Sequence, residues 1–203
     1  MSEVKVKLCG LRRVEDIAFA NEAQPDYIGF VFAPKSRRAV TAVEARALRE
    51  QLSAGIIPVG VFVNQPVELV AQLLNDGVID WAQLHGQEDE SYLTALRRLT
   101  AKPILQAFRV ETQADVVRAA ASSADGILLD NGAGGTGEAF DWSLVRDCDR
   151  PFFLAGGLTP ENVAEAIAQV RPYAVDTSSG VETAGWKDRE KMRRFVQAVR
   201  AAG

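Results

Sequence analysis

The sequence predicts an α/β protein of the (β/α)8 TIM-barrel class, with residues 1–203 forming a single domain. Eight short runs of apolar and β-branched residues alternate with helical patterns along the chain, and no linker separates them. Such alternation is typical of a parallel sheet covered by helices. Eight units are enough to close the sheet into a barrel, which removes both exposed edges. The alternative is an open, doubly wound sheet.

The predicted elements follow from residue type and periodicity. The strands are expected at Val4–Cys9, Tyr27–Phe32, Ile57–Phe62, Trp81–Leu84, Pro103–Phe108, Gly126–Asp130, Phe152–Ala155 and Ala174–Asp176. Helical patterns cover Val14–Glu22, Thr41–Leu52, Val67–Leu74, Glu90–Leu99, Ala114–Ala121 and about Asp188–Arg200. Thr41 and Glu44 stand at capping-box spacing. The segment Thr159–Glu161 predicts another helix start, with threonine as the N-cap and proline in the first turn.

Composition narrows the class of function. The net charge is −4 with both signs mixed along the chain, so a nucleic-acid partner is not expected. No apolar run is long enough to span a membrane and no secretory signal opens the chain, which favours the cytoplasm. Cys9, Cys148 and the single histidine, His85, form neither a disulfide framework nor a metal site. We therefore expect no soft-ligand metal site.

The first strand brings a thiol to the catalytic face, because barrel chemistry lies at the C-terminal ends of the strands. A period of two points Lys5, Lys7 and Cys9 into the barrel, with Cys9 at the upper rim. We hypothesise that the ammonium of Lys7 increases the thiolate fraction of Cys9. We further expect Asp176, on the last strand, to pair with Lys5 or Lys7. The alternative role for Cys9 is that of a small buried filler.

The sixth strand ends in a carboxylate, Asp130, followed by the glycine-rich stretch Gly132–Gly137. This stretch formally matches a dinucleotide-binding motif, but such a motif belongs to an early βαβ unit. A flexible lid beside Asp130 explains the glycines better. The alternative role for Asp130 is a helix cap or a loop hydrogen bond.

The last two strands are followed by small residues that favour phosphate binding. Gly156 and Gly157 follow the seventh strand, and Ser178, Ser179 and Gly180 follow the eighth. Loops in these two positions often form a phosphate site in barrels, since glycines let backbone N–H groups approach an anion. The alternative is that they are only tight turns.

Two further positions at the rim are candidate ligand-binding residues. The segment Lys35–Arg38 carries three cations that could hold a carboxylate, although a solvated charged run is the ordinary explanation. His85 follows the fourth strand, and we interpret it as lining the pocket, because a lone histidine does not make a nucleophile–base arrangement.

Several segments together resemble one family, in register and over almost the whole chain. They are Lys7–Leu11, Gly29–Arg38, Val59–Asn64, Gln83–Gly86, Leu128–Asp130, Gly134–Gly137, Phe140–Trp142, Ala155–Val163 and Val175–Glu182. The set is similar to the phosphoribosylanthranilate isomerases. The resemblance implies an Amadori rearrangement of N-(5'-phosphoribosyl)anthranilate to 1-(2-carboxyphenylamino)-1-deoxyribulose 5-phosphate, a step of tryptophan biosynthesis. This chemistry requires neither a metal nor a cofactor, because the iminium of the substrate accepts the electrons.

The resemblance also implies roles for individual residues. Cys9 corresponds to the general base and Asp130 to the general acid, while Arg38 corresponds to the residue that holds the anthranilate carboxylate. The residues that correspond to the phosphate-binding loops are Gly156, Gly157, Ser178, Ser179 and Gly180. The partner is then a small-molecule substrate, and the chain is a monomer or a homodimer. The alternatives are a thiamine-phosphate synthase-like transferase and a barrel that binds sugar phosphate without turning it over.

Overall fold

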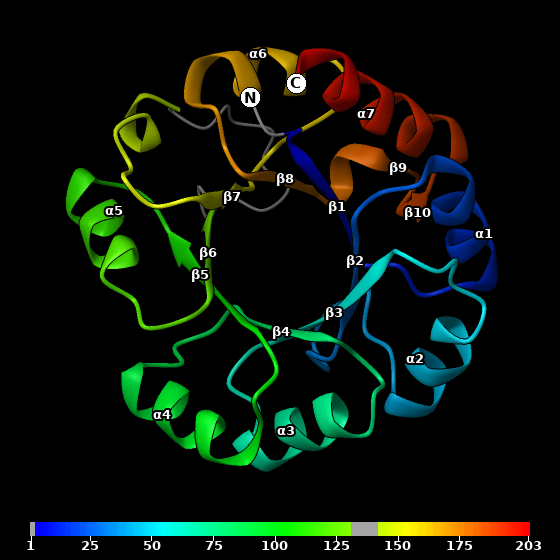
Figure 1. Ribbon diagram of the computed structural model, residues 1–203. Coiled ribbons are helices and arrows are strands. Elements are labelled where there is room, and N and C mark those ends of the chain that lie inside the picture. The colour runs from blue at the N-terminus through cyan, green and yellow to red at the C-terminus, as the bar shows by residue number, and fades with distance from the viewer. Residues whose placement is uncertain (1–2, 131–141) are drawn as a thin grey trace.

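The computed structural model describes residues 3–130 and 142–203. Its first eight strands form one closed parallel barrel in the order of the sequence (Figure 1). This confirms the barrel and excludes the open sheet. The strands are β1 Lys5–Cys9, β2 Tyr27–Val31, β3 Ile57–Phe62, β4 Trp81–Leu84, β5 Ile104–Arg109, β6 Gly126–Asp130, β7 Phe152–Leu154 and β8 Ala174–Thr177. The predicted glycine-rich lid, Gly132–Gly137, lies outside the described residues.

The helices surround the barrel. They are α1 Val14–Ala23, α2 Ala42–Arg49, α3 Val67–Asn75, α4 Glu90–Leu99, α5 Gln113–Ala120, α6 Val163–Val170 and α7 Arg189–Ala202. Between β6 and β7, the described residues contain the short 3-10 helix η1, Trp142–Val145, instead of a full α-helix. After β8 come a second 3-10 helix, η2 Ser179–Val181, and a two-stranded hairpin of β9 Glu182–Thr183 and β10 Trp186–Lys187. No described helix is long and apolar enough to cross a membrane.

The two predicted helix starts have different outcomes. The capping box before α2 is confirmed, since Thr41 Oγ1 accepts from the Glu44 N–H at 3.2 Å and the Glu44 carboxylate accepts from the Thr41 N–H at 2.7 Å. The prediction for Thr159 was wrong. Asn162 is the N-cap of α6, and its Oδ1 accepts from the Thr159 N–H at 2.8 Å. Residues 159–162 therefore form a hydrogen-bonded turn, and α6 begins only at Val163.

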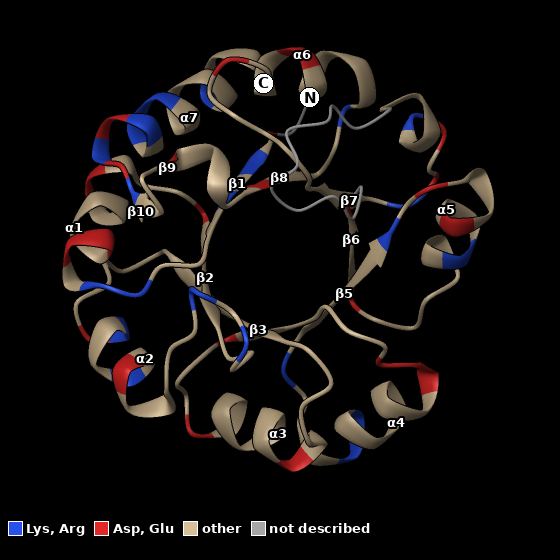
Figure 2. Ribbon diagram, turned by 180° about the vertical axis from the view of Figure 1, so that it is seen from behind, with Lys and Arg blue, Asp and Glu red and all other residues tan. Residues whose placement is uncertain are grey.

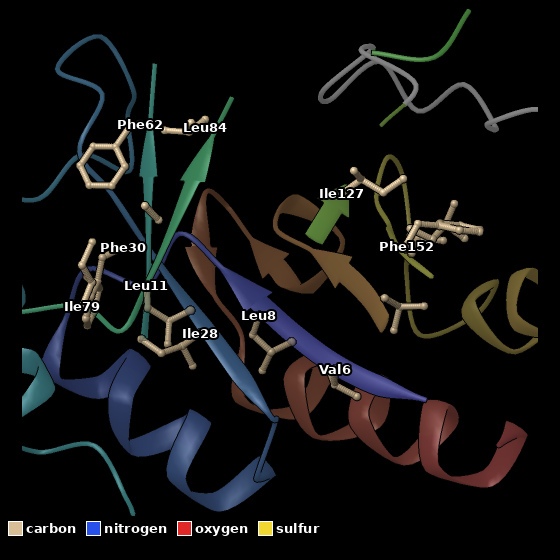
Figure 3. Close-up of a cluster of buried hydrophobic side chains, with 14 of the residues drawn as sticks. Val6, Leu8, Leu11, Ile28, Phe30, Phe62, Ile79, Leu84, Ile127 and Phe152 are labelled. Carbon is tan, nitrogen blue, oxygen red and sulfur yellow. The ribbon is translucent and has the colours of Figure 1, made fainter. Parts of the chain in front are cut away.

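Two apolar layers hold the barrel together, one outside the strands and one inside. Val6, Leu8 and Ile28 are fully buried in the outer layer, between the strands and the helices (Figure 3). The inner layer fills the barrel with Tyr27, Val59, Leu105, Leu128, Phe153 and their neighbours. The helix ring carries charged residues of both signs, which are interspersed around it (Figure 2). The interior is thus a packed core, and the C-terminal rim is left for chemistry.

Candidate active site

A cavity of about 200 Å³ lies at the C-terminal ends of the strands. The residues around it come from both halves of the chain, and every site residue predicted from the sequence is among them. These are Cys9, Arg38, His85, Asp130, Gly156, Gly157, Ser178, Ser179 and Gly180. Gln83 and Asp176 also line the cavity, although neither was predicted as a substrate-binding or catalytic residue.

The end of β1 is shaped to accommodate the sulfur of Cys9. In the parallel pair of β1 and β2, Cys9 stands opposite Gly29. A Cβ atom at Gly29 would lie 2.6 Å from Cys9 Sγ, so a glycine is needed there to leave room for the thiol. The carbonyl oxygen of Cys9 accepts a hydrogen bond from Ser178 Oγ at 3.0 Å. The backbone at the end of β1 and the loop after β8 are thus directly hydrogen-bonded.

A buried ion pair lies below the thiol, where β1 and β8 close the barrel. Lys7 is fully buried, and its Nζ lies 2.9 Å from Asp176 Oδ1, which confirms the predicted pairing of Asp176. The register places these two residues side by side on neighbouring strands. Lys5 instead pairs with Asp26 at 2.9 Å. The carboxylate of Asp176 therefore compensates the charge of Lys7, which is the lysine of β1 that solvent does not reach.

The acidity of Cys9 results from opposing effects. Burial raises the pKa of the Cys9 thiol, and the nearby carboxylate of Asp176 adds to the rise, whereas the ammonium groups of Lys7 and Lys187 lower it. The net pKa is raised. Lys7 thus acts in the direction predicted from the sequence, but burial outweighs it. In the free protein, most of the thiol is protonated at neutral pH.

The candidate acid lies against His85. The Nε2 atom of His85 is 3.6 Å from Asp130 Oδ2, longer than a hydrogen bond, and its Nδ1 atom is 2.8 Å from Gln83 Nε2. The other amide atom of Gln83, Oε1, is buried without a hydrogen-bond partner among the described residues. A polar side chain from β4 thus orients the imidazole that faces Asp130. The sequence identified His85 as pocket lining but gave no role to Gln83.

The two loops predicted to hold phosphate are packed closely against each other. Gly156 and Gly157 have φ angles of 94° and 66°, which favour glycine. A Cβ atom at Gly180 would lie 1.9 Å from the carbonyl oxygen of Leu158, and the same oxygen accepts from Thr177 Oγ1 at 2.7 Å. The glycines are therefore required for the close approach of the loops after β7 and β8.

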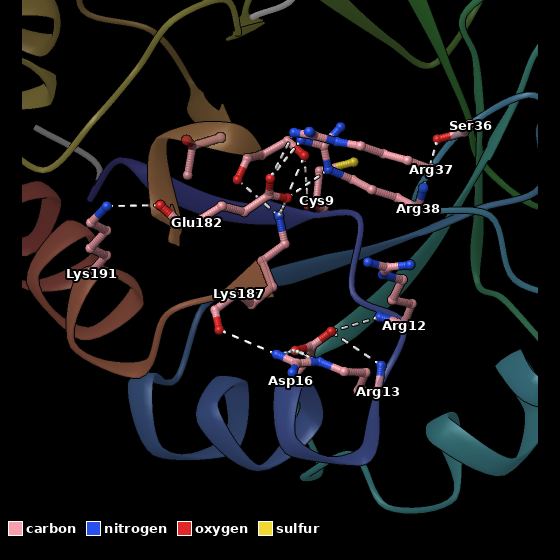
Figure 4. A network of polar contacts seen from close by, with 12 residues as sticks. Cys9, Arg12, Arg13, Asp16, Ser36, Arg37, Arg38, Glu182, Lys187 and Lys191 are labelled. Atoms are coloured by element: carbon pink, nitrogen blue, oxygen red, sulfur yellow. Dashed lines mark hydrogen bonds and ion pairs between the residues drawn. The ribbon is translucent and has the colours of Figure 1, made fainter. Parts of the chain in front are cut away.

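Arg38 enters the site in a network that sequence reasoning did not foresee (Figure 4). Its Nε and Nη2 atoms donate to the two carboxylate oxygens of Glu182 at 2.6 and 2.8 Å. Lys187 Nζ donates to the same carboxylate at 2.8 Å. Burial raises the pKa of Glu182, but the hydrogen bonds and charges of Arg38 and Lys187 outweigh it and lower the pKa to about 2. Glu182 ends the last segment of the family resemblance, but no pattern in the sequence gave it a role.

The fold and the site together define a class. A thiol and a carboxyl group line one cavity at the C-terminal rim of a (β/α)8 barrel, beside an arginine and two glycine-rich loops. This arrangement is that of a (β/α)8-barrel enzyme whose titratable side chains meet at the C-terminal rim.

Comparison with known proteins gives the particular family. A family model described as N-(5'-phosphoribosyl)anthranilate (PRA) isomerase matches residues 6–198. An N-(5'-phosphoribosyl)anthranilate isomerase of Caldanaerobacter subterraneus subsp. tengcongensis is 47% identical, over 97% of this chain and 98% of that protein. One of Pseudomonas fluorescens is also 47% identical, over 98% and 100%. The chain therefore belongs to the N-(5'-phosphoribosyl)anthranilate isomerase family, which decides against the transferase alternative.

Solved structures agree with this assignment. The phosphoribosyl anthranilate isomerase of Thermotoga maritima has a TM-score of 0.89 and 38% identity, with 98% of this chain and 99% of that chain covered. A phosphoribosyl anthranilate isomerase in complex with reduced 1-(o-carboxyphenylamino)-1-deoxyribulose 5-phosphate has a TM-score of 0.86 and 37% identity, with the same coverage.

Proposed function

We propose that the chain converts N-(5'-phosphoribosyl)anthranilate to 1-(2-carboxyphenylamino)-1-deoxyribulose 5-phosphate, with Asp130 as general acid and Cys9 as general base. Membership of the isomerase family supports the reaction. The observation that carries the residue roles is that Cys9 and Asp130 line one cavity together with Arg38 and both glycine-rich loops. One similar protein was solved with the reduced form of this product.

The first step is the opening of the furanose ring. The proton of the Asp130 carboxyl group passes to the ring oxygen as the bond from that oxygen to C1 breaks, and the electron pair stays on the oxygen. The lone pair of the anthranilate nitrogen forms a C=N bond with C1, which leaves an iminium ion. Asp130 must be protonated before this step and becomes a carboxylate. The imidazole of His85, 3.6 Å away, can then stabilise that carboxylate.

The second step removes the proton at C2. The Cys9 thiolate takes this proton, and the electron pair of the C–H bond forms a C1=C2 double bond while the iminium nitrogen becomes neutral. The resulting enolamine tautomerises to the ketose when C1 gains a proton and the C2 hydroxyl loses one. Because the iminium of the substrate accepts the electrons, no step in this scheme requires a metal or a redox cofactor.

The substrate has an anionic group at each end, which fits the two kinds of binding residue at the rim. We assign the anthranilate carboxylate to Arg38, whose side-chain carbons pass close above Gly10. A Cβ atom there would lie 2.4 Å from Arg38 Cδ. We assign the phosphate to the backbone of the loops after β7 and β8. Holding both ends fixes C1 and C2 between the acid and the base.

A fluorescence assay that follows the consumption of freshly prepared phosphoribosylanthranilate tests the proposal. Cys9→Ala and Asp130→Asn should each lower kcat by roughly 10² to 10⁴ fold while the protein stays folded. Cys148→Ala is the matched control, because Cys148 is the other free cysteine and does not line the cavity. Near-normal turnover by either active-site variant would refute the role assigned to that residue.

We also propose that residues 1–203 act as one catalytic domain in the cytoplasm, as a monomer or a homodimer. The isomerase of Thermotoga maritima is described as dimeric, which makes a dimer the first state to test. Size-exclusion chromatography with light scattering at several protein concentrations distinguishes the two states.

A further inference from the structure

Arg38 presents only part of its guanidinium to Glu182. A guanidinium can bind one carboxylate along the edge formed by Nε and one terminal nitrogen, and a second along the edge formed by its two terminal nitrogens. Glu182 occupies the first edge, at 2.6 Å from Nε and 2.8 Å from Nη2. The arginine is therefore held from one side, while its second edge, which includes Nη1, is not used by Glu182.

The carboxylate of Glu182 has no capacity for further donors. Only 5% of its side chain is exposed. Besides the two bonds from Arg38, it accepts from Arg37 Nη2 at 3.1 Å and from Lys187 Nζ at 2.8 Å. Four hydrogen bonds fill the lone pairs of a carboxylate. Glu182 is thus fully engaged in holding cations, which excludes a role as an acid or base in the reaction.

The hairpin of β9 and β10 fixes Glu182 and Lys187 beside each other. The two residues are paired across the antiparallel strands. The turn consists of Ala184 and Gly185, whose φ angles of 51° and 80° are those of a tight hairpin turn. Lys187 Nζ also donates to the carbonyl oxygen of Ser178 at 2.8 Å. The hairpin therefore connects Arg38 with the loop after β8.

Neighbouring segments hold the hairpin in position (Figure 4). Lys191 Nζ, on α7, donates to the carbonyl oxygen of Glu182 at 2.8 Å. Arg13 Nη2, before α1, donates to the carbonyl oxygen of Lys187 at 3.3 Å. The guanidinium of Arg12 lies 4.0 Å from the ring centre of Trp186. The hairpin is thus anchored on both sides of the β8–β1 junction.

We propose that Glu182 is a positioning residue, which holds one edge of Arg38 so that the other edge meets the carboxylate of the substrate. Lys187 connects this clamp to the loop assigned to phosphate. The inference rests on the proposed function, because it requires Arg38 to bind the substrate carboxylate.

If the charge of Glu182 is removed, a positioning role and a purely electrostatic role predict opposite changes in KM. Glu182 carries a negative charge close to the site of an anionic substrate, so its removal should tighten binding if charge alone mattered. If Glu182 instead orients Arg38, removal of its charge should weaken binding, because the guanidinium loses its fixed direction. The direction of the change in KM therefore separates the two explanations.

The experiment measures kcat and KM of Glu182→Gln with freshly prepared phosphoribosylanthranilate. We expect KM to rise roughly tenfold, with kcat changed by less than about threefold, since the chemical groups remain in place. Glu190→Gln is the matched control, because Glu190 is exposed on α7 and pairs only with Arg193 among the described residues. In an Arg38→Met background, Glu182→Gln should have no further effect on KM.

A second variant guards against loss of folding. Glu182→Asp keeps the charge but shortens the side chain by one carbon, and it should also raise KM. A wild-type or lower KM in either folded Glu182 variant overturns the inference. So does a further rise in KM when Glu182→Gln is added to Arg38→Met. If the wild-type protein itself does not consume the substrate, the proposed function fails. If the wild type is active and the Glu182 variants have the wild-type KM, the proposed function stands and only the inference about Glu182 fails.

Discussion

The buried pair of Lys7 and Asp176 makes the stability of the barrel depend on one carboxylate. Lys7 is fully buried, and its ammonium has an ion-pair partner at 2.9 Å in Asp176. In Asp176→Asn, this ammonium stays buried without a compensating charge. Removal of one partner of a buried pair costs about 3–5 kcal/mol. For a chain of this size, each kcal/mol lowers Tm by about 2–4 °C, so we expect Tm to fall by roughly 6–20 °C.

Urea denaturation at neutral pH, followed by circular dichroism, measures the free energy of unfolding directly. The matched surface variant is Glu190→Gln, whose pair with Arg193 is exposed and should contribute about 0–1 kcal/mol. The double variant Lys7→Met with Asp176→Asn should recover most of the lost stability, because the unpaired buried charge is gone. A cost below about 1 kcal/mol for Asp176→Asn, or no recovery in the double variant, would refute this reasoning.

Three further predictions follow from other contacts. In Gly180→Ala, the added Cβ would lie 1.9 Å from the Leu158 carbonyl oxygen, so the loops after β7 and β8 must separate. We therefore expect kcat/KM to fall at least about tenfold, and unchanged kinetics would contradict this. Burial raises the pKa of the Cys9 thiol, so the rate at which iodoacetamide alkylates Cys9 in a Cys148→Ala background should still climb at about pH 9, and a rate that levels off well below this pH would contradict the raised pKa. The pKa of Glu182 is lowered from 4.5 to about 2, so its contribution of roughly 3 kcal/mol to stability is present above pH 4.5 and lost as the pH falls towards 2. Acid titration of the unfolding free energy should therefore be less steep in Glu182→Gln than in the wild type.

Much of the site could be predicted because barrel strands deliver their last residues to one rim. Cys9 ends β1 and Asp130 ends β6, so strand assignment alone brought both to the same face. The contact between Lys7 and Asp176 was also predictable, since β1 and the last strand must meet when the sheet closes. Residues that act by orienting another side chain were harder to identify from the sequence. Gln83 lies within a strand and Glu182 within a two-residue strand of a hairpin, and neither position marks a role by itself.

The sequence by itself determined the barrel, the order of its strands and the residues at its rim, because side-chain periodicity and turn residues are local properties. Only the tertiary structure decided which side chains meet. Arg38 and Glu182 are 144 residues apart, and no local pattern predicts their contact. The acidity of Cys9 was likewise undetermined, since it is the sum of burial and of charges from Lys7, Asp176 and Lys187, which lie on three different strands. Such sums depend on distances of a few ångströms, and the packing of the whole chain sets these distances.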